Sequence, residues 1–193
     1  MFQIIPKNII EYVKVYDNFI DADCCDQTVA SLEKIDWAVH KFYNPVTDSY
    51  FSHEKELATS FDDIIESTLL KEKIWSAIAQ YIVKDFSNFK KWFPGWEGFA
   101  HLKFNKYVAG TEMAVHCDHI KTVFDGNRRG VPILSVILLL NDSYTGGDFI
   151  MWEDTKINLK KGSICIFPSN FIFPHRVQEI TSGIRYTCVS WVW

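Results

Sequence analysis

The sequence predicts an α+β chain in which helices come first and a β-rich region follows. Over residues 61–89, apolar side chains recur every three or four positions, which is the period of a helix. Over residues 99–193, eight short stretches rich in β-branched and aromatic residues are separated by Gly, Asn and Asp, which is typical of a sandwich or jelly roll. We therefore expect the helices to cover one face of a sheet.

The first half of the chain contains three further predicted segments. Residues 9–16 are rich in Ile, Val and Tyr and favour a strand. Asp21 or Asp23 can cap a helix that runs to about Ile35, and residues 37–43 read as a second strand. The helical pattern of residues 61–89 is expected in two pieces, of which the second lies on a sheet.

The strands predicted for the second half are residues 100–107, 114–118, 133–140, 148–152, 157–159, 163–167, 175–180 and 185–193. The chain contains no internal repeat, low-complexity tract or flexible linker. We expect one domain over residues 1–193, with residues 1–98 supporting a core formed by residues 99–193.

Composition limits the classes of function. Of 193 residues, 48% are hydrophobic and 16% aromatic, which is ample for a sizeable core. The net charge of -4 argues against nucleic acid as the main partner, because a polyanion attracts a clustered basic surface. Five cysteines are an odd number, and adjacent Cys24 and Cys25 would form a strained disulfide, so a reducing compartment fits better.

Neither a secretory signal nor a membrane span is evident. The N-terminus lacks a basic region followed by a long apolar region. The longest apolar run, residues 131–140, is interrupted by Pro132 and Ser135 and has about half the length needed to cross a bilayer. We expect a cytoplasmic protein and interpret this run as a buried strand.

A possible metal site begins with the pair His116 and Asp118. Side chains two residues apart in a strand point to the same side, so both can reach one ion. His175 follows about sixty residues later. Two imidazoles and one carboxylate on one face of an ion are the ligands of non-haem Fe(II) oxygenases. The alternatives are a chance surface tripeptide and a core histidine whose ring nitrogen bonds a backbone carbonyl.

Arg185 supplies a second observation. Residues 181–183 predict a turn that folds the last strand back as a hairpin and places Arg185 opposite Gln178. One face of that strand then carries Arg185, Thr187, Val189, Trp191 and Trp193. A guanidinium on the apolar inner face is unfavourable unless an anion neutralises it. A dicarboxylate that chelates the metal at one end and meets Arg185 at the other satisfies this charge.

Further motifs flank these residues in a fixed order. They are Tyr107 and Gly110 before His116, residues 135–142 followed by Gly146-Gly147-Asp148-Phe149, Lys161-Gly162-Ser163 leading to Phe167-Pro168, His175 with Val177, and Arg185 with Trp191. In this series the sequence resembles the Fe(II)- and 2-oxoglutarate-dependent dioxygenases, in particular the prolyl 4-hydroxylase-like branch. The resemblance spans residues 99–193 and implies a double-stranded β-helix (jelly roll) core.

The resemblance implies a role for each site residue. His116, Asp118 and His175 would ligate Fe(II). Arg185 would hold the distal carboxylate of 2-oxoglutarate, where many relatives have Lys, and Tyr107 would add a hydrogen bond or be an ordinary half-buried aromatic. Pocket-wall positions are implied for Thr187 and Trp191. Arg128 and Arg129 are either substrate-facing or a solvated loop pair.

The implied reaction is hydroxylation of an aliphatic C–H bond with O2, coupled to conversion of 2-oxoglutarate to succinate and CO2, with ascorbate as a further candidate cofactor. Asp118 favours hydroxylation, since halogenating relatives need that ligand position for chloride. Relatives that act on alkylated nucleic acid carry a second Arg six residues after the first, where this chain has Trp191. The leading substrate is therefore a prolyl or other peptidyl residue.

Three alternatives to peptidyl hydroxylation stay open at this point. The substrate can be a free amino acid or small metabolite, because one fold serves many substrates. The chain can be a jelly-roll module that binds a sugar or small anion without redox chemistry. It can also be a cupin-like isomerase or hydrolase that uses Zn or Mn.

Residues 44–59 are either a lid over the site or a surface loop.

Overall fold

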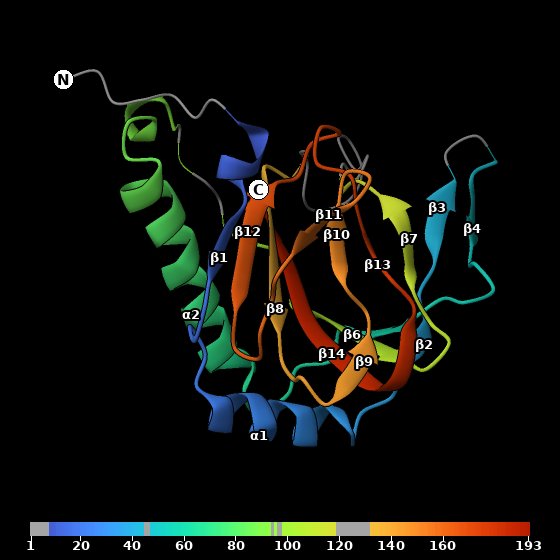
Figure 1. Ribbon diagram of the computed structural model, residues 1–193. Coiled ribbons are helices and arrows are strands. Elements are labelled where there is room, and N and C mark those ends of the chain that lie inside the picture. Colours follow the sequence, from blue (N-terminus) through green and yellow to red (C-terminus); the bar gives the residue numbers. More distant parts are fainter. Residues whose placement is uncertain (1–7, 45–46, 94, 96–97, 119–131) are drawn as a thin grey trace.

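A computed structural model describes residues 8–44, 47–93, 95, 98–118 and 132–193, and two β-sheets with flanking helices form its framework (Figure 1). The helical elements are η1 (Ile9–Tyr12), α1 (Ala22–Leu32), α2 (Ser67–Ala79), the π-helical η2 (Gln80–Asp85) and η3 (Lys90–Trp92). The strands of the first half are β1 (Lys14–Tyr16), β2 (Ala38–Val39), β3 (Phe42–Asn44), β4 (Ser49–Phe51) and β5 (Ala58–Ser60). The strands of the second half are β6 (Lys103–Val108), β7 (Met113–His116), β8 (Leu134–Leu139), β9 (Tyr144–Gly146), β10 (Phe149–Met151), β11 (Thr155–Ile157), β12 (Ile164–Pro168), β13 (His175–Val177) and β14 (Ile180–Val192).

The sheets are antiparallel throughout. The larger runs in the order β1-β12-β8-β14-β6-β5-β2, with β9 paired to β14, and the smaller in the order β11-β10-β13-β7. Strands β3 and β4 form a separate hairpin beyond β7 (Figure 1). This pair of facing sheets with few helices is the predicted jelly roll.

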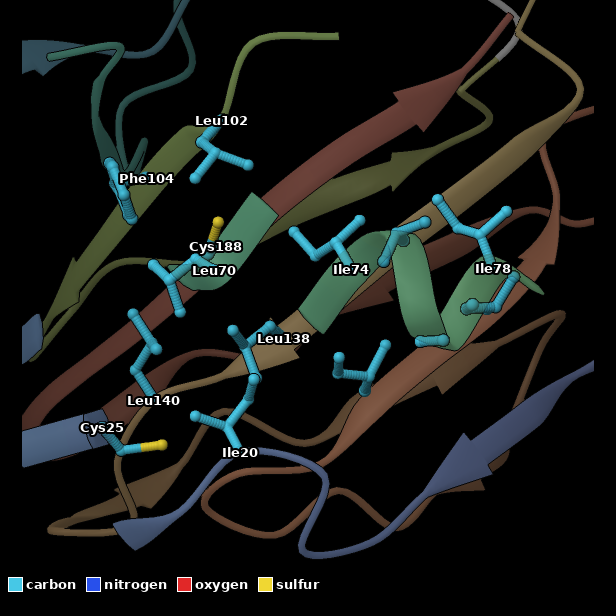
Figure 2. Close-up of a cluster of buried hydrophobic side chains, with 14 of the residues drawn as sticks. Ile20, Cys25, Leu70, Ile74, Ile78, Leu102, Phe104, Leu138, Leu140 and Cys188 are labelled. Atoms are coloured by element: carbon cyan, nitrogen blue, oxygen red, sulfur yellow. The ribbon is translucent and has the colours of Figure 1, made fainter. Parts of the chain in front are cut away.

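The apolar core has two parts. One lies between the helices and the outer face of the larger sheet, where Leu70, Ile74 and Ile78 of α2 meet Leu138 and Cys188 (Figure 2). The helical spacing of the three α2 residues places them on one side, as predicted, and each such buried side chain stabilises the fold by roughly 1.5–3 kcal/mol. The second part lies between the two sheets and surrounds the cavity described below.

The prediction of a strand over residues 9–16 is wrong for its first half. Ile9–Tyr12 forms the 3-10 helix η1, because the side chain of Asn8 accepts a hydrogen bond from the Ile10 N–H and starts a turn. Helix α1 begins after Asp21, as predicted, and ends at Leu32 rather than near Ile35. Regular helix α2 starts only at Ser67, later than the apolar pattern suggested.

The predicted hairpin between residues 175–184 and the last strand is also wrong. Residues 181–183 lie inside β14, and β13 pairs with β10 and β7 instead. The turn-like Thr-Ser-Gly sequence coincides with a register shift between Ile180 and Ser182, where β14 pairs with β9. Gly183 adopts a positive φ of 76° here. Arg185 therefore lies opposite Tyr107 of β6 and not opposite Gln178.

Several other expectations concern surface segments and thiols. Within residues 44–59, the described part contains strand β4 of the β3–β4 hairpin and the start of β5. Arg128 and Arg129 lie outside the described residues. All five cysteines are free thiols. Within the part of the chain that the structure describes, no helix combines the length and the apolar character needed to cross a membrane.

Candidate metal and cosubstrate site

Strands β7 and β13 bring two histidines together. His116 ends β7, His175 begins β13, and the two residues are direct partners in the antiparallel ladder. Asp118 follows two residues after His116, so its carboxylate returns to the same side. One ligand atom from each of the three residues lies within 4.8 Å of the others. The Asp118 oxygens are 3.5 Å from His116 Nε2 and 3.7 Å from His175 Nε2.

Backbone carbonyls orient both imidazole rings. His116 Nδ1 lies 2.8 Å from the carbonyl oxygen of Ala114, and His175 Nδ1 lies 3.1 Å from that of Phe173. A neutral ring that donates through Nδ1 keeps a lone pair on Nε2, which is the atom that faces Asp118. The alternative of a core histidine bonded to a carbonyl thus accounts for only one nitrogen of His175.

The charges at this cluster suit a divalent cation. Burial lowers the pKa of His175 to about 4, so its ring is neutral near pH 7. Burial would raise the pKa of Asp118, but His175, His116 and a hydrogen bond from Ser135 outweigh it and lower that pKa. Two neutral imidazoles and one ionised carboxylate on one face are donors that fit Fe(II).

A pair of serines holds the carboxylate in place. Ser135 of β8 donates from Oγ to Asp118 Oδ2 over 2.6 Å, and its Oγ lies 2.8 Å from the Oγ of Ser169. Both serines are buried. A buried donor of this kind fixes the orientation of a ligating carboxylate. Ser135 begins the sequence motif of residues 135–142 named above. The alternation of residues along a strand does not reveal that its side chain bonds Asp118.

Arg185 lies deeper in the same cavity. It is 2% exposed, and its guanidinium carbon is 5.1 Å from the ring centre of Tyr107 and 6.0 Å from that of Tyr144. Gly147 makes room for it, since a Cβ there would approach Ile180 Cδ1 to 2.3 Å and Arg185 Cδ to 3.2 Å. Aromatic faces stabilise the cation but neutralise no charge.

Three buried polar atoms on this wall have no hydrogen-bond partner among the described residues. They are Arg185 Nε, Thr187 Oγ1 and Asn105 Oδ1. Thr187 and Asn105 are ladder partners on β14 and β6, next to the pair of Arg185 and Tyr107. Unpaired buried donors and acceptors cost about 1–3 kcal/mol each, so a row of them indicates a polar ligand.

The predicted site residues line one cavity. Its walls include His116, Asp118, His175, Tyr107, Arg185, Thr187 and Trp191. The predicted alternation along the last strand is therefore correct for residues 185, 187, 189 and 191, although the predicted strand pairing was not. The cavity also contains Lys103 and Asn105, which sequence reasoning missed. Both alternate with Tyr107 on β6, and this period-two spacing was a signal that could have found them.

Comparison with known proteins shows which protein family the sequence of this site resembles. Residues 102–193 match the model of the 2OG-Fe(II) oxygenase superfamily. This part of the chain is therefore similar to that superfamily. Its members use Fe(II), 2-oxoglutarate and O2. The matched segment contains every cavity residue named above and nearly coincides with the core predicted for residues 99–193.

Sequence relatives carry the name PKHD-type hydroxylase. One from Synechococcus elongatus is 28% identical over 146 residues, which are 73% of this chain and 57% of the relative. One from Rippkaea orientalis is 33% identical over 97 residues, which are 47% of this chain and 41% of the relative. The chain thus spans about half the length of the curated relatives that it matches.

Solved structures share the fold at low sequence identity. A Pseudomonas putida prolyl-4-hydroxylase has a TM-score of 0.65 and 18% identity, with 93% of this chain and 91% of that chain covered. A viral collagen prolyl hydroxylase from Paramecium Bursaria Chlorella virus-1 has a TM-score of 0.62 and 16% identity, with 94% of each chain covered. These likenesses confirm the jelly-roll fold.

Proposed function

We propose that this chain is an Fe(II)- and 2-oxoglutarate-dependent dioxygenase that hydroxylates an aliphatic C–H bond. The observation that carries the proposal is one cavity with a two-histidine, one-carboxylate cluster at one end and a buried, unneutralised Arg185 at the other. The proposed reaction adds one oxygen atom of O2 to the substrate carbon and the other to succinate, with CO2 released from 2-oxoglutarate. Residues 99–193 are the proposed catalytic core.

Each part of the cavity has a proposed task. His116, Asp118 and His175 would hold Fe(II), which when bound supplies the activation of O2. The Arg185 fork would bind the distal carboxylate of 2-oxoglutarate through two parallel hydrogen bonds, with the Tyr107 ring against it. The Thr187 hydroxyl would donate to an oxygen of the same cosubstrate.

Aromatic side chains would keep water from the metal end. The ring centres of Phe149 and Phe167 are 5.5 and 5.0 Å from that of His175. A closed apolar wall of this kind protects a reactive species from solvent.

The leading substrate is a prolyl or other peptidyl residue. The β3–β4 hairpin supports this choice, because Phe42 lies 6.2 Å from the His116 ring and contacts Phe51 and His53 in an edge-on or tilted arrangement. Phe51 and His53 are exposed, so an extended peptide could lay an apolar ring on this surface beside the metal cluster. The names of the relatives, PKHD-type hydroxylase and prolyl-4-hydroxylase, point the same way.

A succinate-release assay across proline-containing peptides, with mass spectrometry for a gain of one oxygen, tests the proposal. His175→Ala should abolish succinate formation, whereas His101→Ala, which changes an exposed histidine outside the cavity, should not. Turnover of the His175 variant at the wild-type rate would contradict the metal assignment. Succinate release with free amino acids but with no peptide would instead favour a small-molecule substrate.

A spectroscopic test separates this function from a non-redox binding module or a Zn or Mn hydrolase. Under anaerobic conditions, Fe(II) and 2-oxoglutarate together should produce a weak visible metal-to-ligand band with the wild-type protein. A protein that shows no such band and works without oxygen would refute the dioxygenase assignment.

A further inference from the structure

Lys103 is a second buried cation in the same cavity. It lies on β6 on the same face as Asn105 and Tyr107, lines the cavity wall and is only 7% exposed. Its Nζ is 5.9 Å from the centre of the Trp191 ring. Among the described residues, no carboxylate oxygen comes within ion-pairing distance of it, so carboxylates attract its ammonium group only over a longer range.

The strand register puts Lys103 and Arg185 at opposite ends of the cavity. Lys103 pairs with Val189, and Arg185 pairs with Tyr107, four residues away along both strands. Four residues of strand correspond to about 13 Å. Lys103 belongs to the metal end, because Asp118 is the main attractive charge that acts on it. The two cations therefore bracket the row of unpaired polar atoms of Thr187 and Asn105.

The buried charges form a balanced set. Glu56, whose side chain is 2% exposed, also attracts Lys103 and bonds His40 over 3.1 Å. Burial lowers the pKa of His40, so that imidazole is neutral near pH 7. Lys103 and Arg185 thus match Asp118 and Glu56. A divalent cation adds two positive charges, which one dicarboxylate cancels, so cation and dicarboxylate together keep the cavity neutral.

We propose that Lys103 is a second cosubstrate anchor, which binds the carboxylate of the 2-oxo acid end of 2-oxoglutarate while Arg185 binds the distal carboxylate. This inference rests on the proposed function. The enclosed position of Lys103 favours the cosubstrate over a peptide, because a side chain 7% exposed lies on the inner wall and not at the surface. Two cations at the two ends would select both the length and the double charge of the acid.

The test uses Lys103→Met, which keeps the length of the side chain and removes its charge. Anaerobic titration of the Fe(II)-loaded protein, followed by the visible band, should show 2-oxoglutarate binding weakened about tenfold to a hundredfold, the range for loss of a hydrogen bond to a charged group. Binding of 2-oxobutanoate, which has only the 2-oxo acid end, should weaken by the same factor. Competition by 4-oxopentanoate, which has only the distal carboxylate, should not change.

A second readout excludes a merely structural effect. Lys103 repels a divalent cation, so Lys103→Met should bind Fe(II) as tightly as the wild type or more tightly, while 2-oxoglutarate binding falls. Lys106→Met is the matched control, because Lys106 lies on the opposite face of β6 over the Trp37 ring. It should change neither affinity. Lys103→Gln repeats the test if the methionine variant does not fold.

Three outcomes overturn the inference. Unchanged binding of both 2-oxo acids to Lys103→Met, alongside a normal wild-type band, refutes the role of Lys103 and leaves the proposed function intact. An equal loss of affinity for all three compounds and for Fe(II) would show that Lys103 stabilises the fold and does not bind the cosubstrate. No band with the wild-type protein refutes the proposed function itself, and the inference with it.

Discussion

Ser135 offers a sharp test of how the fold prepares its metal ligands. Its hydroxyl donates to Asp118 over 2.6 Å, and both residues are buried, with Asp118 8% exposed. Ser135→Ala removes one hydrogen bond to a buried charge, worth about 1.5–3 kcal/mol. Because about 1.4 kcal/mol corresponds to a factor of ten, Fe(II) affinity should fall about 10- to 100-fold.

Anaerobic Fe(II) titration of the purified protein measures this loss directly. Ser169→Ala is the matched control, because Ser169 contacts the Ser135 hydroxyl and no hydrogen bond joins it to Asp118. The control should lose less affinity than Ser135→Ala. Equal losses in the two variants, or unchanged affinity in a folded Ser135→Ala protein, would show that the serine does not orient the carboxylate.

Four further perturbations probe the cavity and the core. Arg185→Gln should raise the 2-oxoglutarate concentration needed for half-maximal succinate release by about 10- to 100-fold, with Fe(II) affinity unchanged; a loss of Fe(II) affinity instead would show that Arg185 acts on the metal end. Gly147→Ala should weaken 2-oxoglutarate binding, since Gly147 has a φ of 66° and the new Cβ would press on Ile180 and Arg185; isothermal titration measures this, and unchanged affinity would refute the packing argument. For the metal-free protein, the free energy of unfolding should fall by up to roughly 3 kcal/mol as pH drops from about 6.5 to about 4, because the unfolded chain takes up a proton on His175 that the folded chain resists; His175→Ala should flatten this part of the profile from urea denaturation. Thiol labelling of the native protein should be slow at the three cysteines whose pKa burial raises most, Cys25, Cys165 and Cys188, and rapid labelling of all five would contradict the packing of both core parts.

The sequence was most informative where a local period decides which way a side chain points. Alternation in the last strand correctly puts residues 185, 187, 189 and 191 on one face, and the pair His116 and Asp118 faces one side for the same reason. The apolar spacing of α2 likewise identifies its buried side. These are properties of a single segment, so neither the fold nor a partner strand is needed to infer them.

Strand pairing could not be predicted from the sequence, because it depends on segments that are far apart along the chain. Residues 181–183 have the composition of a turn, yet they continue β14 through a shift in register, since β9 supplies the hydrogen bonds that a hairpin would have made. The wrong hairpin placed Arg185 opposite Gln178, whereas β6 places it opposite Tyr107. The side of the strand on which Arg185 lies could be predicted, but the residue opposite it on the neighbouring strand could not.

The same limit explains why Lys103 and Ser135 were missed. Each is a polar residue in a strand that was predicted, but what a buried lysine or serine binds depends on the residues that lie opposite it. Lys103 becomes informative because β14 brings Trp191 to it and β7 leads the chain to Asp118. A polar residue on the predicted inner face of a barrel strand is costly to bury. Such a residue therefore indicates a ligand even before its partner is known, and the alternation of Lys103 and Asn105 with Tyr107 already met that condition.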